Sequence, residues 1–170
     1  GQTVETYLQS YRNDWSWYYG KGLVENGIRP IFYIPSLKTE GLFETDTGIS
    51  VRFLPLAGWY RPFENKWLKR VARRNPISLY LDERLNTIAF MEPLMEALSE
   101  DCADVLYIQE YWSARFDHIV SRVQTPVTGA DHGGVSKGVL KLRKRAAFAA
   151  SRGLYCQTAE ECSTVQAYGG

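Results

Sequence analysis

The 170-residue sequence has little of what metal and cofactor sites need. It holds two histidines and three cysteines, and Cys102, Cys156 and Cys162 form no C-x-x-C pair, which argues against a metal site. There is no G-x-G-x-x-G after the first predicted strand and no G-x-x-x-x-G-K-[ST], so neither a dinucleotide fingerprint nor a P-loop is present. We interpret the cysteines as buried or free thiols of a reducing compartment. The sequence therefore predicts no resident metal or cofactor.

Long apolar runs and a strong net charge are also missing. No window of about 18 apolar residues occurs and no signal-peptide pattern opens the chain, so we expect no membrane span and a cytoplasmic location. The formal net charge of +1 argues against a protein whose whole surface seeks polyanions. The chain opens at Gly1 without methionine and stops at Tyr168-Gly169-Gly170, so we expect it to be one domain of a larger protein.

What the sequence does contain is an alternation of apolar strand and amphipathic helix patterns. With 45% hydrophobic and 23% charged residues, the composition is that of one globular domain. Strands are expected at Val4–Ser10, Ile31–Ile34, Val51–Pro55, Val105–Ile108, Pro126–Thr128 and Leu154–Gln157. Helices are expected at Trp15–Asn26, Pro62–Arg74, around Leu81–Leu98 with a kink or division at Pro93, at Trp112–Val123, from Ser136 to about Arg152, and at Ala159–Tyr168.

Strands that alternate with helices in this way indicate right-handed crossovers and a parallel sheet covered on both faces. The predicted fold class is α/β, a Rossmann-like three-layer sandwich with a mostly parallel sheet. We expect residues 1–170 to form it as a single domain. The apolar stripe of the long central helix, which includes Leu81, Ile88, Met91, Met95 and Leu98, is expected to be core.

In such a fold the ligand crevice lies beyond the carboxyl ends of the strands. The strongest candidate for a ligand-binding loop there is Asp131-His132-Gly133-Gly134. Its two glycines let the backbone approach a ligand closely, and the next helix offers free N–H groups. His132 could exchange a proton with a bound hydroxyl or phosphate. The alternative is a loop histidine bonded to backbone, with glycines that serve the turn. The loops expected to share the crevice are Tyr11–Asp14, Pro35–Lys38 and Gln109–Trp112.

Three elements in order carry a resemblance to a known family. They are the strand Asp104–Gln109, the strand end Thr128–Gly133, and Leu154–Gly169, which runs from a strand into a helix ending in Tyr-Gly. They resemble the D-V-hydrophobic-x-x-Q/H strand, the T-G-x-D-H-G strand end and the Y-G helix end of glycosyltransferase family 4, the group 1 glycosyltransferases. The likeness is to the amino-terminal domain, over about residues 100–170.

The resemblance implies one half of a GT-B fold, the acceptor-binding domain of a retaining glycosyltransferase that moves a sugar from a nucleotide sugar to an acceptor hydroxyl. The carboxyl-terminal domain that binds the nucleotide sugar would be absent from this chain, so we expect the isolated residues to be inactive. No metal or cofactor is implied. The acceptor would be a sugar, a lipid or a small molecule. By position, His132 corresponds to the histidine of the catalytic centre, with Asp131 beside it.

The resemblance also assigns acceptor-facing residues. They are Glu110, Tyr111, Trp112, Gly133 and Gly134. The amino-terminal end departs from the family, whose Gly-Gly loop after the first strand is replaced by Arg12-Asn13-Asp14-Trp15. Arg12 and Asn13 are expected to reach the cleft by their side chains instead. The aromatic run Trp15–Tyr19 either packs its helix on the sheet, which we favour, or stacks on a sugar ring.

Two basic segments add a further candidate partner. One runs from Arg61 to Arg74 with interleaved aromatic residues, and the other includes Lys137, Lys141, Arg143, Lys144, Arg145 and Arg152. Solvated helix faces are the favoured interpretation. The alternative is peripheral contact with an anionic membrane, on its inner face. Nucleic acid is not expected, because no recognition module accompanies the charge.

Two classes of function remain open from the sequence. The first is the acceptor domain of a retaining glycosyltransferase. The alternative is a stand-alone Rossmann-type module that binds a phosphorylated metabolite in the same crevice without catalysis.

Overall fold

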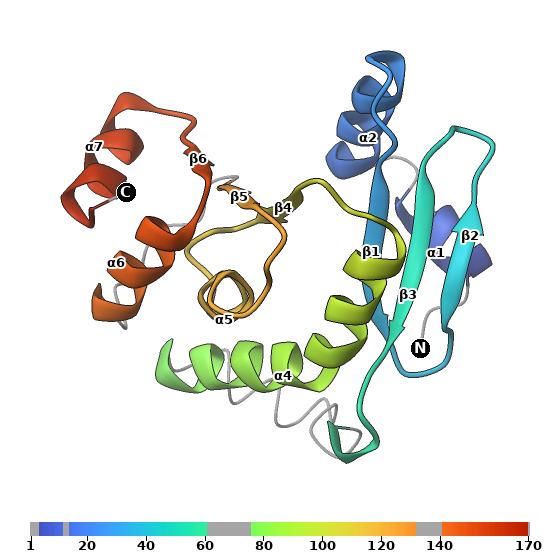
Figure 1. Ribbon diagram of the computed structural model, residues 1–170, viewed down its shortest axis with the longest axis horizontal. Helices are drawn as coiled ribbons and strands as arrows, with labels where there is room; N and C mark the ends of the chain where they lie inside the picture. The colour runs from blue at the N-terminus through green and yellow to red at the C-terminus, as the bar shows by residue number, and fades with distance from the viewer. Residues whose placement is uncertain (1–3, 12–13, 61–75, 132–140, 170) are drawn as a thin grey trace. The chain divides into compact units, whose positions relative to one another are not determined.

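The computed structural model describes residues 4–11, 14–60, 76–131 and 141–169, which form a mixed α/β chain (Figure 1). By their contacts the residues divide into two compact units, 1–58 and 59–170, and each is described by itself. The predicted helix Pro62–Arg74 lies outside the described residues, as do Ser136, Arg12 and Asn13.

The first unit combines two helices with a small mixed sheet. The elements are α1 (Val4–Tyr11), α2 (Trp15–Glu25), β1 (Ile31–Ser36), β2 (Gly41–Glu44) and β3 (Ser50–Pro55). The strand order is β1-β3-β2, with β1 parallel and β2 antiparallel to β3. The predictions of α2, β1 and β3 are confirmed. Strand β2 was not predicted. It lies between β1 and β3 in the chain, so this parallel pair is connected through a strand and not through a helix.

The prediction of a strand at Val4–Ser10 is wrong, because this segment is helix α1. Val4 and Tyr7 are three residues apart, which places both on one face of a helix. Tyr7 is buried with its ring edge-on to Phe53, and Val4 packs against the same apolar cluster. Tertiary packing therefore overrides the strand propensity of the valine and tyrosine.

Pro35 does not end β1 as predicted, since the strand continues to Ser36. Strand β1 lies at the edge of its sheet, where a missing backbone N–H breaks no ladder bond on the open side. The β2–β3 hairpin replaces a predicted loop. Its turn is closed by a bond from the Thr45 N–H to the Ile49 carbonyl, with Gly48 at φ +77° in the left-handed region.

Helix α2 packs closely on this sheet because of a glycine. A Cβ at Gly20 would lie 2.8 Å from Ile49 Cδ1 and 2.9 Å from Phe32 Cζ. Trp17, on the same helix, is 1% exposed and meets the Phe32 ring edge-on. The predicted packing of the aromatic run on the sheet is thus confirmed for Trp17, while Trp15, Tyr18 and Tyr19 are exposed.

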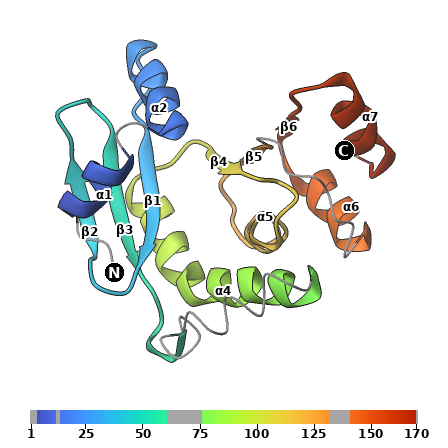
Figure 2. The ribbon, with the colours of Figure 1, turned by 180° about the vertical axis from the view of Figure 1, so that it is seen from behind.

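The second unit is built on a parallel sheet of order β4-β5-β6. Helix α5 lies between α4 and α6 (Figures 1 and 2). The alternation of strand and helix predicted from Asp104 onward is confirmed. The elements are α4 (Pro76–Glu100), β4 (Leu106–Gln109), α5 (Ala114–Val120), β5 (Val127–Ala130), α6 (Lys141–Ala150), β6 (Gly153–Tyr155) and α7 (Ala159–Ala167).

Helix α4 runs through Pro93 without dividing, and Figure 1 shows that it changes direction along its length. The prediction that its whole apolar stripe is core is wrong. Met91 and Leu98 are buried, whereas Leu81, Ile88 and Met95 are exposed. In the second half of the helix, the buried face includes Phe90, Leu94 and Ala97. A stripe read at a constant spacing does not follow the face of a helix that bends.

Candidate functional site

Two predicted site loops meet at one edge of the parallel sheet. Gln109 ends β4 and is paired in register with Ala130, which ends the neighbouring strand β5. The loop Glu110–Ser113, here the β4 loop, therefore starts beside Asp131. The Glu110 N–H donates to the Ala130 carbonyl at 2.6 Å. Asp131 itself is 3% exposed. This is the edge at which parallel sheets of α/β proteins bind ligands.

Glu110 has an unusual backbone for its residue type. Its φ is +64°, in the left-handed region that costs a non-glycine residue about 1–2 kcal/mol. The side chain is exposed. Such a conformation persists only where the surroundings hold it, and it is common at ligand-binding loops. The contacts around the β4 loop show what holds it.

Helix α6 holds the loop through a buried lysine. The Lys144 ammonium donates to the Tyr111 carbonyl, the Ser113 carbonyl and Asp117 Oδ1, each at 2.8 Å. These acceptors use all three of its donors. Burial lowers the pKa of Lys144 and raises the pKa of Asp117, while the charge of each opposes the shift of the other. Two of the three bonds go to the loop backbone, so the lysine sets the path of the loop.

Helix α4 holds the far end of the loop. Glu83 Oε2 accepts from the Ala114 N–H at 2.9 Å, at the first residue of α5. Ser113 caps the same helix, since its hydroxyl accepts from the Phe116 N–H. The Tyr80 hydroxyl donates to Asp117 Oδ2 at 3.3 Å. Burial is the main cause that raises the pKa of Glu83.

Helix α7 holds the loop through Tyr111. The Tyr111 side chain is 0% exposed, and its hydroxyl donates to the Glu161 carboxylate. Burial and this hydrogen bond raise the pKa of Tyr111. The other Glu161 oxygen accepts from the Gln157 N–H at 2.6 Å. The tyrosine thus ties the β4 loop to the start of α7.

An aromatic cluster fills the space beneath the loop. The rings meet at centroid distances of 5.2–6.4 Å, mostly edge to face. Tyr168, which belongs to the Tyr-Gly element at the end of α7, contacts both Trp112 and Phe148. The cluster consists of Tyr111, Trp112, Phe116, Phe148 and Tyr168. It joins two sequence elements that are far apart in the chain.

Gly129 in β5 is required by this packing. A Cβ there would lie 2.8 Å from Phe116 Cε2 and 3.1 Å from Tyr111 Cβ. The glycine of the Thr128-Gly129 pair therefore lets the aromatic cluster rest directly on the sheet.

The predicted site residues fall into three groups. Glu110 and Asp131 lie at the same edge of the sheet, and the Glu110 side chain is open to solvent. Tyr111 and Trp112 lie in the aromatic cluster, where they support the loop with their side chains. His132, Gly133, Gly134, Arg12 and Asn13 lie outside the described residues.

The residues that shape the site were not found from the sequence. Lys144 was assigned to a basic surface helix, and that assignment is wrong because its side chain is 8% exposed and paired with Asp117. A signal was present. Lys144 lies four residues before Phe148, on the buried face that also carries Ala147.

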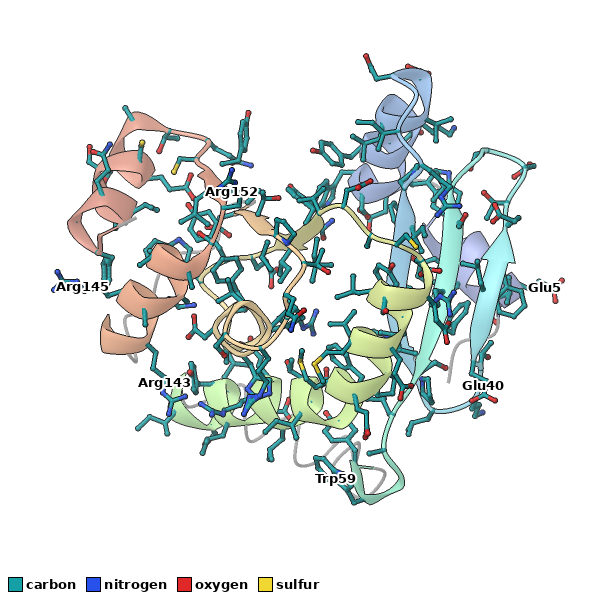
Figure 3. The ribbon with its side chains drawn as sticks, viewed as in Figure 1. Glu5, Glu40, Trp59, Arg143, Arg145 and Arg152 are labelled. Atoms are coloured by element: carbon teal, nitrogen blue, oxygen red, sulfur yellow. The ribbon has the colours of Figure 1, made fainter. Side chains whose placement is uncertain are left out.

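The described arginines of the second basic segment do not form one face. Arg143, Arg145 and Arg152 point in different directions in Figure 3. The first basic segment, Arg61–Arg74, lies outside the described residues. None of the described helices is long and apolar enough to cross a membrane.

No family model, no curated protein and no solved structure matches the chain. Within the part of the chain that the structure describes, no group of three or more His, Cys, Asp or Glu side chains could hold a metal ion.

Proposed function

We propose that the chain is the acceptor-binding domain of a retaining glycosyltransferase, which moves a sugar from a nucleotide-sugar donor to an acceptor hydroxyl. The support is the family resemblance of three elements in the second unit. These elements are neighbours in space, because β4, β5 and β6 pair in parallel. Tyr168 of the third element also packs on Trp112, directly after the first.

The observation that carries the proposal is the strained Glu110 at the carboxyl edge of the sheet. Its backbone is held by bonds from β5, α6 and α7 to the β4 loop, while its carboxylate stays exposed. A carboxylate accepts hydrogen bonds from sugar hydroxyls. A fixed backbone reduces the entropy that the loop loses when it binds a ligand.

The proposed roles of the individual residues follow from this arrangement. Glu110 accepts a hydrogen bond from an acceptor hydroxyl and so orients it. Asp131 orients the adjacent His132, which exchanges or donates a proton at the reacting group. A second domain supplies the nucleotide-sugar site, and most of the rate enhancement comes from positioning the acceptor against the donor.

The same proposal covers the finer fold. We propose a Rossmann-like three-layer fold for the chain, which would be half of a GT-B enzyme in the cytoplasm. A peripheral membrane contact through the Arg61–Arg74 segment is a secondary proposal, tested by sedimentation with anionic and with neutral vesicles.

The test is an assay of nucleoside diphosphate release with a panel of nucleotide sugars and acceptors. The enzyme is the chain joined to the second domain that the proposal requires. His132→Ala is expected to lower kcat by about 10²–10⁴-fold, the usual contribution of a general acid or base. The matched control is His118→Gln, because His118 is the other histidine and lies buried in α5.

Three results would count against the proposal. Near-normal turnover of His132→Ala would remove this residue from the catalytic centre. Sugar transfer by residues 1–170 alone would remove the need for a second domain. Tight binding of a phosphorylated metabolite, without transfer in either form of the protein, would favour the binding module instead.

A further inference from the structure

The last turn of α2 ends in a hydrogen-bonded cap that contains an Asn-Gly pair. The Gly27 N–H donates to the Val24 carbonyl at 2.9 Å. The Ile28 N–H donates to the Leu23 carbonyl at 3.0 Å, and Gly27 has φ +76°. This is a Schellman motif, in which a left-handed glycine lets the last carbonyls of a helix find donors. Asn26 is the only asparagine of the sequence that precedes a glycine.

The Asn-Gly pair has a chemistry of its own. The backbone nitrogen that follows an asparagine can attack the side-chain carbonyl carbon, and a glycine leaves that nitrogen unhindered because it has no Cβ. Asparagine is for this reason among the thermolabile residues of proteins. Asn26 and Gly27 are both exposed, so water and base have access to them.

The cap holds the two reacting atoms apart. Asn26 has ψ 15°, so the Gly27 nitrogen nearly eclipses the Asn26 backbone nitrogen and is turned away from Cβ. The Asn26 Nδ2 donates to the Gly22 carbonyl at 2.8 Å, which fixes the side-chain amide against the preceding turn. Ring closure requires rotation about the Cα–C bond of Asn26, and this rotation breaks the hydrogen bonds of the Gly27 and Ile28 N–H groups. Reaction therefore requires the end of α2 to open.

We propose that Asn26 is a deamidation site whose rate is set by the opening of the end of α2, and that the product keeps this end open. In the open state the Gly27 nitrogen gives its proton to a base and bonds to Asn26 Cγ. The Cγ–Nδ2 bond breaks, ammonia leaves with a proton from solvent, and a cyclic succinimide remains. Water then opens the ring at either carbonyl. The reaction consumes one water, releases one ammonia and yields aspartate or isoaspartate.

The product no longer fits the cap. An aspartate carboxylate cannot donate to the Gly22 carbonyl, and it places a negative charge at the carbonyl end of the helix, which repels it. Isoaspartate lengthens the backbone by a carbon, so the bonds of the Schellman motif lose their register.

Loss of the cap acts on the packing of the first unit. Val24, in the same turn, packs against the apolar cluster of this unit, and its Cγ1 lies 3.1 Å from where a Cβ of Gly48 would be. An open end of α2 therefore loosens its contact with the β2–β3 turn. The inference does not depend on the sugar-transfer proposal, because it concerns the end of α2 alone.

The experiment is a time course of the whole chain in mildly alkaline buffer, folded and in urea, followed by brief trypsin digestion and mass spectrometry. Trypsin does not cleave between Arg29 and Pro30, so Asn26 lies in peptide 22–38, which contains no other asparagine and no glutamine. Deamidation raises the mass of this peptide by about 1 Da, because an OH group replaces an NH₂ group. An unincubated sample gives the blank. The folded chain should react about tenfold more slowly than the denatured chain.

A variant that loosens the end of α2 tests whether opening sets the rate. Val24→Ala should speed deamidation of the folded chain about fivefold and leave the rate in urea unchanged. The matched control is Leu42→Ala, an exposed truncation on β2 of the same unit, which should change neither rate. Circular dichroism checks that both variants stay folded.

Asn26→Asp tests the effect of the product. It should raise the hydrogen-exchange rate of the Gly27 and Ile28 amides about threefold above that of Asn26→Ala, which removes the side-chain bond without adding a charge. The proposal is overturned by any of four results. The folded chain deamidates as fast as the denatured one, it does not deamidate at all, Val24→Ala leaves its rate unchanged, or Asn26→Asp exchanges no faster than Asn26→Ala.

Discussion

Two turns of the second unit place a non-glycine residue in the left-handed region, Cys102 at φ +50° and Glu110 at φ +64°. Cys102 ends a helix. The Ala103 N–H donates to the Leu98 carbonyl at 3.0 Å, as in the usual left-handed end of a helix, where glycine is preferred. The strain at Cys102 therefore has a local cause within α4.

The left-handed backbone of Glu110 has no such local cause, because Glu110 follows strand β4 and not a helix. Its conformation is maintained by the bonds that β5, α4, α6 and α7 make to the β4 loop and its ends. The comparison teaches that positive φ alone does not mark a site. A strained residue held by contacts from distant parts of the sequence is the stronger indication of function.

The largest effect is expected when the main support of the β4 loop is removed. Lys144→Met leaves Asp117 buried without its cation, which should lower the free energy of unfolding by about 3–5 kcal/mol. Urea denaturation measures it. The control is Arg143→Met, an exposed neighbour on α6, with an expected change within about 0.5 kcal/mol. Equal effects of the two changes would show that Lys144 does not hold the loop.

A smaller effect is expected at the contact between the aromatic cluster and the sheet. Gly129→Ala pushes a methyl group against Phe116 and Tyr111, and should cost about 1–3 kcal/mol. Gly153→Ala is the control in the neighbouring strand, since no described atom lies within 4 Å of its added Cβ. Thermal melting compares them, and a Gly129→Ala protein as stable as Gly153→Ala would contradict the packing described.

Acid should weaken α5, which anchors the end of the loop. Burial, with the nearby Arg122 and Arg84 charges, lowers the pKa of His118 from 6.5 to about 4. Between these values the unfolded chain binds a proton that the folded chain does not, so stability falls as pH drops. The loss should be about 2 kcal/mol by pH 4. His118→Gln should lack this part of the pH profile, and parallel profiles would refute the assignment.

The smallest effects concern the two strained residues themselves. Cys102→Gly should stabilise the protein by about 0.4–1 kcal/mol, because glycine adopts this backbone freely. Glu110→Gly should stabilise it by a similar amount for the same reason. Differential scanning calorimetry resolves such shifts. A loss of stability in Glu110→Gly would show that its side chain makes a folding contact and that the comparison with Cys102 fails.

The sequence predicted the second unit well because each strand and helix there is a short, separate pattern. Pro126 marks the start of one strand and Thr158 caps one helix, and both signals are local. The first unit was predicted less well, since α1 has strand-forming residues and β2 lies in a Thr- and Gly-rich stretch. Only contact with β3 makes the first segment a helix and the second a strand.

The sequence predicted that Glu110 and Asp131 lie close together, but it did not reveal the residues that support the β4 loop. The position of Glu110 and Asp131 follows from strand order, which the alternating pattern reveals. The roles of Lys144 and Asp117 depend on two helices that meet across 27 residues of sequence. The spacing of Lys144 from Ala147 and Phe148 places it on the buried face of α6, but its pairing with Asp117 leaves no signal in a single sequence.

The most direct test of the account compares Glu110→Gly with Cys102→Gly in the sugar-transfer assay. Both changes remove backbone strain, and Glu110→Gly also removes the proposed acceptor contact. The account predicts that kcat/KM for the acceptor falls by about tenfold or more in Glu110→Gly, the cost of losing a hydrogen bond to a charged group, and is unchanged in Cys102→Gly. An unchanged kcat/KM in Glu110→Gly would contradict the role of the β4 loop in binding the acceptor.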